Sequence, residues 1–181
     1  MAWTAPMTAV DGAIFTASQF NANIRDNFLE TAPGKATAAN GYFVATGANS
    51  IAERFPASLA VNVLDTTASP TYGDLATTSG PSVTVATGTK ALVIITAQVD
   101  NDAIGGIALA TVQVSGASTV NVTDDNSIGF EQDGTSGQLV VTSRARMYTL
   151  TPGSNVFTMK YRSLAGGTSR FHRREIIVIP F

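Results

Sequence analysis

Turn-forming residues recur about every ten residues through the second part of the chain, and this spacing constrains the fold more than any other feature. From residue 58 to Phe181, short stretches rich in valine, isoleucine and threonine alternate with clusters of glycine, proline, serine and aspartate. Pairs such as Pro152-Gly153 and Gly166-Gly167 separate these stretches, as tight turns require. Stretches this short suit strands better than helices. The spacing therefore predicts an all-β domain.

The predicted strands have the number and length expected of a β-sandwich. Residues 92–95 and 176–179 are apolar at every position, so we expect their strands to lie centrally, under a second layer or against a neighbouring subunit. Eight or nine strands over about 120 residues favour a sandwich, with a jelly roll as the architecture we expect. The predicted strands are residues 60–65, 82–86, 91–99, 107–114, 119–123, 128–132, 138–150, 155–162 and 169–179.

Composition narrows the classes of function. Charged residues make up only 13% of the 181 residues, about half the usual share, and there is no cysteine. The absence of cysteine excludes disulfides and thiolate metal sites. A net charge of -2 argues against bulk electrostatic binding to nucleic acid. The longest apolar run, residues 91–95, is far shorter than the roughly 20 residues that span a bilayer, so we expect no membrane insertion.

The first 57 residues form a separate region with one helix signal. Thr16 and Gln19 have the spacing of a capping box, which satisfies free N–H groups at the start of a helix. Phe15 and Phe20 stand where a hydrophobic staple belongs. The pattern predicts a short helix that begins at residue 17. The chain is thus expected to divide into residues 1–57 and a β-sandwich at residues 58–181.

The helix carries one narrow apolar stripe, made by Phe20, Ile24 and Phe28 at intervals of four residues. Pro33-Gly34 is expected to end the helix. A short helix with one apolar stripe is not stable alone. Two alternatives therefore stay open: the stripe packs against the β domain of the same chain, or it packs against other copies or a particle.

Two further elements flank this helix. Residues 2–14 show no periodicity and contain Trp3, which indicates an extended arm that buries its indole ring somewhere. The arm begins without a basic segment followed by an apolar one, so we expect no secretory signal. Residues 41–46 and 50–55 enclose a three-residue loop with Gly47, the pattern of a β-hairpin. A lone hairpin is marginal in water, so it also needs a partner.

Charges are segregated along the β region. Residues 65–133 hold eight acids and one base, Lys90, whereas residues 144–174 hold seven bases and no acid. The two groups are expected to pair across neighbouring strands of one domain or between subunits; a nucleic-acid surface is the third option. The arginines assigned to such ion pairs are Arg144, Arg146, Arg170, Arg173 and Arg174.

No catalytic constellation stands out in the sequence, and we expect a non-enzymatic protein without cofactor or metal. His172 is the sole histidine and is followed by two arginines. The sequence has no Gly-x-Ser-x-Gly motif that would supply a serine nucleophile for this histidine to activate. Residues 100–102 and 124–126 resemble Asx-rich turns more than calcium loops. Glu131 and Asp133 share one face of a predicted strand, which leaves a glycan-cleaving carboxylate pair as a minor alternative.

Three segments resemble structural proteins of tailed bacteriophages. Residues 17–28 (ASQFNANIRDNF) resemble the short N-terminal helix of such proteins. Residues 41–56 (GYFVATGANSIAERFP) are similar to a hairpin near the N-terminus of tail fibres and of head-attached fibre or decoration proteins. Residues 150–162 (LTPGSNVFTMKYR), with residues 176–180, look like the last strands of trimeric jelly-roll heads. The resemblance implies a virion structural protein with an anchoring N-terminus and a surface-exposed, trimeric β domain.

These observations support one leading function and one alternative. The leading function is capsid decoration of a bacteriophage assembled in the host cytoplasm, with Trp3, Phe15, Phe20, Ile24 and Phe28 as anchoring or oligomerisation residues. Its partners would be its own copies, as a homotrimer, and major capsid or tail proteins. The alternative is a minor tail or receptor-binding protein whose sandwich binds a host-surface glycan, with Tyr72 and Tyr148 as candidate aromatic contacts. Neither function involves nucleic acid.

Overall fold

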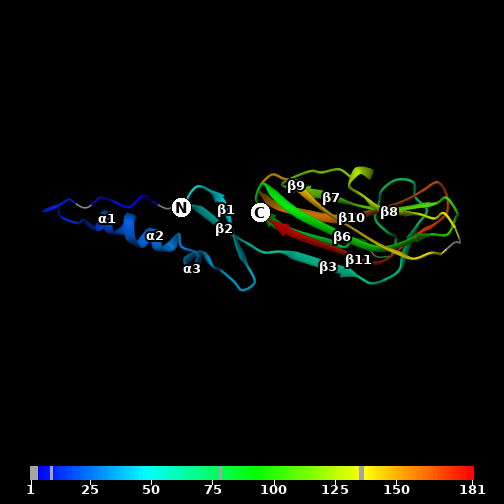
Figure 1. Ribbon diagram of the computed structural model, residues 1–181, viewed down its shortest axis with the longest axis horizontal. Coiled ribbons are helices and arrows are strands. Elements are labelled where there is room, and N and C mark those ends of the chain that lie inside the picture. The colour runs from blue at the N-terminus through cyan, green and yellow to red at the C-terminus, as the bar shows by residue number, and fades with distance from the viewer. Residues whose placement is uncertain (1–3, 9, 78, 135–136) are drawn as a thin grey trace. The chain divides into compact units, whose positions relative to one another are not determined.

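The computed structural model describes residues 4–8, 10–77, 79–134 and 137–181. The chain divides into two compact units, Met1–Phe55 and Pro56–Phe181 (Figure 1). The boundary expected from the sequence lies two residues later, after residue 57. Each unit is described by itself below. No helix in the described part of the chain is long and apolar enough to cross a membrane.

The first unit contains the expected short helix in an irregular form. Three consecutive segments make it: α1 (Ala17–Phe20), a π-helical segment (Asn21–Arg25) and α2 (Asp26–Leu29). The helix ends at Leu29, and Pro33-Gly34 lies inside a further short helix, α3 (Ala32–Lys35), rather than terminating the first. That expectation was wrong because proline is tolerated in the first turn of a helix, where its missing N–H leaves no bond unmade.

A β-hairpin completes the first unit, as the sequence predicted. Strands β1 (Tyr42–Gly47) and β2 (Ser50–Arg54) are antiparallel, with Tyr42 opposite Arg54. In the turn, Asn49 has a φ of 54°, a left-handed conformation that asparagine adopts at lower cost than most residues. The turn residue therefore explains why the chain reverses at this point.

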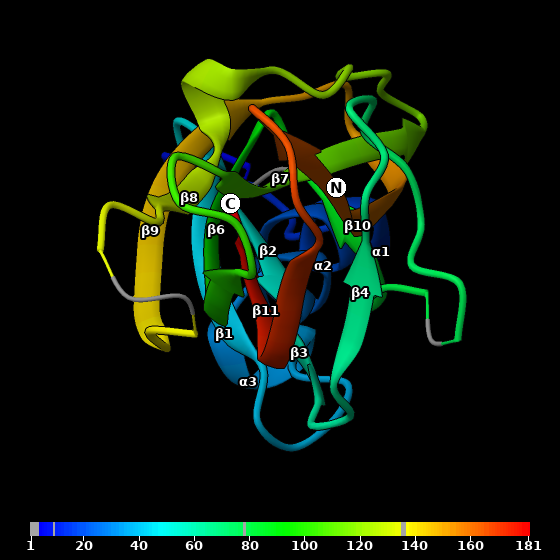
Figure 2. The same cartoon turned by 90° about the vertical axis from the view of Figure 1, so that its right-hand side faces the viewer.

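The second unit is a sandwich of two antiparallel sheets. One sheet has the order β5-β10-β7-β8, and the other has the order β3-β11-β6-β9, with β4 also paired to β11. Figure 2 shows β9, β6, β11 and β3 following one another across the second sheet. The strands are β3 (Ala57–Val61), β4 (Asp65–Thr67), β5 (Ser82–Thr87), β6 (Lys90–Asn101), β7 (Ile107–Gly116), β8 (Ile128–Glu131), β9 (Val140–Thr149), β10 (Gly153–Leu164) and β11 (Ser169–Pro180).

The strand order is that of a jelly roll. Because β3 and β4 pair with successive parts of β11, they act as two halves of one first strand. Counted this way, one sheet holds the first, eighth, third and sixth strands, and the other holds the second, seventh, fourth and fifth. This interleaving defines the double Greek key. The predicted fold class, a mainly β jelly-roll-like sandwich with an N-terminal arm, short helix and hairpin, is confirmed.

The core lies between the two sheets, and along its strands fully buried residues alternate with partly exposed ones. Phe157, Met159 and Tyr161 of β10 are fully buried, while the residues between them are partly exposed. One predicted strand is absent: residues 119–123 form only an isolated bridge between Val120 and Val114 before a short 3-10 helix. After that bridge the Thr111 hydroxyl, rather than a main-chain ladder, bonds this segment to β7, through the Thr123 carbonyl.

Candidate functional site

The start of the N-terminal helix is fixed by its own side chains. The Thr16 main-chain N–H donates to Gln19 Oε1 at 2.9 Å, and the Gln19 main-chain N–H donates to Thr16 Oγ1 at 3.2 Å, which confirms the capping box. The Phe15 and Phe20 rings pack edge to face with centroids 6.2 Å apart, as expected of the hydrophobic staple. This geometry sets the angle at which the arm enters the helix.

Asparagine side chains hold the arm against the helix, and sequence reasoning missed this role. The nearly buried Asn27 side chain accepts from the Thr4 N–H at 2.9 Å and donates to the Thr4 carbonyl at 3.0 Å. Asn27 and Asn23 also donate to helix carbonyls four residues earlier. Asparagine is a poor residue for a helix interior, so its repetition in this helix was the available signal.

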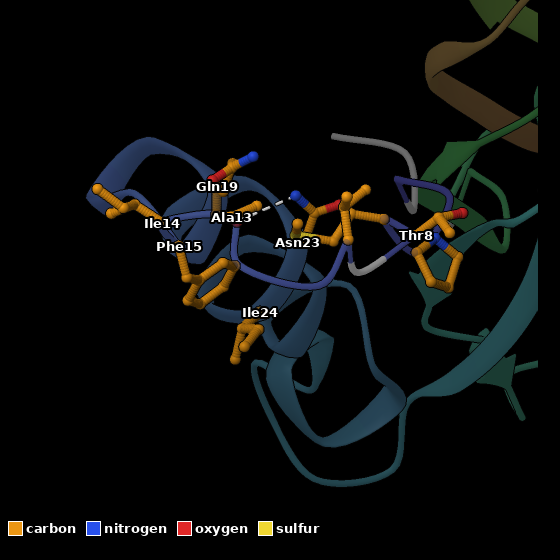
Figure 3. Close-up of a pocket in the computed structure, with 10 residues that line it drawn as sticks. Thr8, Ala13, Ile14, Phe15, Gln19, Asn23 and Ile24 are labelled. Carbon is orange, nitrogen blue, oxygen red and sulfur yellow. Dashed lines mark hydrogen bonds between the residues drawn. The ribbon is translucent and has the colours of Figure 1, made fainter.

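The arm and the helix enclose an apolar cavity of about 460 Å³. In Figure 3, Phe15 and Ile24 line it from the helix side, and Asn23 donates to the Gln19 carbonyl at its edge. Of the predicted stripe, only Ile24 lines the cavity. The lining residues are Pro6, Met7, Thr8, Val10, Ala13, Ile14, Phe15, Gln19, Asn23 and Ile24.

The predicted anchoring residues are exposed within this chain. Phe15 is 49% exposed, Phe20 47%, Ile24 37% and Phe28 69%. Trp3, the fifth predicted anchor, lies outside the described residues. Soluble proteins rarely leave several large apolar side chains exposed on one small unit unless that surface meets a partner. We call Phe15, Phe20, Ile24 and Phe28 the helix patch.

The β-sandwich has a second apolar surface, on the outer side of one sheet. Leu92 and Ile94 of β6 lie opposite Ile179 and Ile177 of β11. All four side chains are half-buried and alternate with fully buried neighbours, so they point away from the core. Met147 of β9 lies opposite Leu92 and is 47% exposed. These five residues form the apolar sheet face. Four of them lie on β6 and β11, which are central in their sheet as the sequence predicted, and Met147 lies on the edge strand β9.

Segregated charges meet across the β-sandwich. Three bases from residues 144–174 pair with acids from residues 65–133 inside the same domain. Two of these pairs lie on partly exposed surfaces, and pairs of that kind contribute about 0–1 kcal/mol each. In the third pair the carboxylate is almost fully buried. The pairs are Lys160 with Asp74, Arg162 with Asp124, and Arg170 with Asp100.

The other arginines assigned to ion pairs have different surroundings. Arg144 donates to the Ser127 carbonyl at 3.2 Å, and the Arg146 guanidinium lies 5.7 Å from the centre of the Tyr148 ring. Arg173 is exposed at a bulge in β11. Within the part of the chain that the structure describes, Arg144, Arg146 and Arg173 form no ion pair. Whether they pair between subunits stays a prediction.

Arg174 is fully buried, although its neighbour Arg173 is exposed. Its Nη1 donates to the Gly80 carbonyl at 3.2 Å, and its Nη2 donates to the Val63 carbonyl at 3.2 Å. The guanidinium also lies 5.4 Å from the centre of the Tyr161 ring. Arg174 therefore connects two loops to the core and is part of the fold.

Neither tyrosine proposed as an aromatic contact for glycans has a ring face that is free to stack against a sugar. Tyr72 donates its hydroxyl to Asp124 at 2.9 Å, and the Arg162 guanidinium covers its ring at 4.7 Å. Burial, together with the hydrogen bond to Asp124, raises the pKa of Tyr72 to about 12. Tyr148 is 5% exposed, and burial raises its pKa as well. Both rings are occupied by contacts within the domain.

The raised pKa values of these tyrosines make the free energy of unfolding depend on pH in the alkaline range. A raised phenol pKa means that the folded state favours the neutral form. This contribution is complete below the unfolded pKa of about 10 and is lost as pH rises through the folded pKa of about 12 for Tyr72. We expect urea midpoints to fall across this window and to fall less steeply in Tyr72→Phe. An equal decline in both proteins would contradict a role for Tyr72.

The residues considered for catalysis, Glu131, Asp133 and His172, lie on the surface of the β-sandwich. Glu131 and Asp133 are both exposed to solvent. His172 lies on the outer side of β11, opposite Gln98. Among the described residues there is no group of three histidine, cysteine or acidic side chains placed to hold a metal ion.

No protein-family model matches the chain. No curated protein matches it either. Among solved structures, the chain is similar to a mutant VP2 protein of infectious bursal disease virus from T=1 particles. The sequence identity is 13% and the TM-score is 0.43, and the match covers 79% of this chain and 39% of that chain. It is also similar to a structure of the Gx strain of that virus, at 11% identity and a TM-score of 0.40 over 79% of this chain and 39% of that chain. The chain thus spans well under half the length of these proteins.

Proposed function

We propose that the protein is a non-enzymatic structural component of a bacteriophage virion. Its N-terminal unit attaches it to the particle, and its β-sandwich is displayed outward. The contrast between the two units carries this proposal. The sandwich closes a core of its own, whereas the N-terminal unit leaves the helix patch exposed to solvent.

The helix patch has the energetics of a docking surface. Fully burying one large apolar side chain stabilises by about 1.5–3 kcal/mol relative to leaving it exposed. The patch offers four such side chains, each more than a third exposed. Contact with a particle surface would bury them together, which offsets the cost of association. We infer that the partner is a major capsid protein, which makes the protein a capsid decoration. The resemblance of residues 17–28 and 41–56 fits a tail protein equally, and the absence of a long fibre repeat from the sequence favours the capsid.

We also propose that the protein is a homotrimer. The apolar sheet face supports this, because closed rotational symmetry lets each copy cover part of a neighbour's apolar surface. Within the described residues Arg144, Arg146 and Arg173 form no ion pair, and pairing of these arginines between subunits is part of this proposal. The wild-type protein is expected to be trimeric by native mass spectrometry at micromolar concentration, and a stable monomer would contradict this proposal.

Replacing Ile177 by aspartate is expected to convert the trimer into monomers. Position 177 is half-buried in the free chain, so the carboxylate of the introduced aspartate would stay partly hydrated there. Burial in an interface would remove that hydration at a cost of several kcal/mol. Light scattering and native mass spectrometry measure the change. Thr84→Asp is the matched control, since Thr84 is exposed on β5 of the other sheet. A trimeric Ile177→Asp protein would place the interface elsewhere.

Imaging of intact particles tests the proposed function. Particles carrying the protein are expected to show threefold knobs on the capsid surface, which particles lacking the protein do not show. Density at the tail instead would favour the minor tail alternative. The absence of the protein from purified particles would overturn the proposal.

A further inference from the structure

The outer side of the sheet that carries the apolar sheet face also holds a polar cavity of about 440 Å³. Its walls come from the end of β6, the segment before β9, β11 and the residue preceding β4. The polar lining residues are Asp100, Asp102, Arg170 and His172, and Leu64 and Leu139 provide apolar walls. No role assigned above to the sandwich uses this cavity.

The guanidinium in this cavity is held in a fixed orientation. Arg170 Nε donates to Asp100 Oδ1 at 2.7 Å, and its Nη2 donates to the other carboxylate oxygen of Asp100. The Asp100 side chain is only 1% exposed, so it supports Arg170 from beneath. A guanidinium has five N–H donors, and this pair uses two of them. Arg170 therefore presents an oriented donor edge to the cavity.

Asp102 provides an acceptor that is also held in place. Its Oδ1 accepts the Thr168 main-chain N–H at 2.7 Å, which fixes the carboxylate at the edge of the cavity. His172 lies two residues after Arg170 on the same side of β11. Its imidazole has one nitrogen that donates and one that accepts when neutral. Donors and acceptors thus converge on one space.

The charge balance of the cavity decides which ligand it suits. Arg170 neutralises Asp100, and with the imidazole counted as neutral the lining keeps one negative charge, on Asp102. This charge repels anions. Sugar hydroxyls both donate and accept hydrogen bonds, so they match a lining that contains donors and acceptors. Leu64 and Leu139 are both about half exposed and can cover the apolar C–H face of a sugar ring. We propose that this cavity binds a neutral saccharide.

The cavity and the apolar sheet face do not coincide. Asp100 lies six residues beyond Ile94 on β6, which corresponds to about 20 Å along an extended strand. A trimer contact centred on the apolar sheet face is therefore not required to cover the cavity. The inference rests on the proposed function only in that outward display brings the cavity to a host surface.

Binding of the full-length protein to an array of neutral, sialylated and sulfated glycans tests this inference. We expect binding to neutral glycans, and a dissociation constant raised about tenfold or more in Asp102→Asn and in His172→Ala. The first variant replaces a charged acceptor by a neutral amide, which forms weaker hydrogen bonds to sugar hydroxyls, and the second removes the imidazole. Asp125→Asn is the matched control, because Asp125 is an exposed carboxylate outside the cavity lining. Circular dichroism checks that each variant keeps its β structure.

Three results would overturn the inference: no neutral glycan binds, only anionic glycans bind, or both cavity variants bind as tightly as the wild type. Particle occupancy, measured in parallel, separates this failure from that of the proposed function. Full occupancy without glycan binding rejects the saccharide site alone. Glycan binding by a protein that is absent from particles rejects the virion role alone.

Discussion

Replacing Ile24 by aspartate is expected to abolish attachment to particles while the β-sandwich stays folded. Ile24 is 37% exposed and lines the cavity between arm and helix. A carboxylate there remains hydrated in the free protein, but docking would remove that hydration at a cost of several kcal/mol. Because 1.4 kcal/mol corresponds to a tenfold change in affinity, the dissociation constant for particles should rise at least a hundredfold. Cosedimentation with particles measures the loss.

Ser18→Asp is the matched control for this experiment. Ser18 is exposed in the first turn of the same helix and does not line the cavity, and an acidic residue there suits the helix dipole. Phe28→Asp is a second test, because Phe28 is the most exposed member of the helix patch. Full occupancy by both Ile24→Asp and Phe28→Asp would show that the helix is not the anchor.

Replacing Arg174 by alanine is expected to lower the free energy of unfolding by about 3–5 kcal/mol. The substitution leaves the Gly80 and Val63 carbonyls without these donors and opens a cavity beside Tyr161. Domains of this kind are stable by only about 5–15 kcal/mol, so the loss is a large fraction of the total. Urea unfolding followed by circular dichroism measures it.

Arg173→Ala provides the comparison on the neighbouring residue. Arg173 is exposed, so its truncation should change stability by no more than about 0.5 kcal/mol. The two variants remove the same side chain from adjacent positions, which isolates the effect of burial. Equal stabilities would mean that Arg174 does not hold the loops that it contacts.

The elements of this fold that depend on near neighbours could be predicted from the sequence. Unbroken apolar runs identified the central parts of β6 and β11, and the Thr16–Gln19 spacing identified the helix start. The turn around Asn49 marked the hairpin. In each case the deciding interaction joins residues within a few positions of each other, or repeats with the period of a strand, so the pattern is visible along the chain.

Contacts between residues far apart in the sequence were decided only by the tertiary structure. The bulge in β11 buries Arg174 and exposes Arg173, two residues that the sequence treated alike. Asn27 reaches Thr4, and Arg170 meets Asp100, because the folded chain brings their segments together. The sequence by itself determined the strands, the hairpin and the helix cap, since their signals are local. Three features depend on which strands become neighbours: the burial of Arg174, the polar cavity and the apolar sheet face. The packing of the whole domain determines which strands are neighbours.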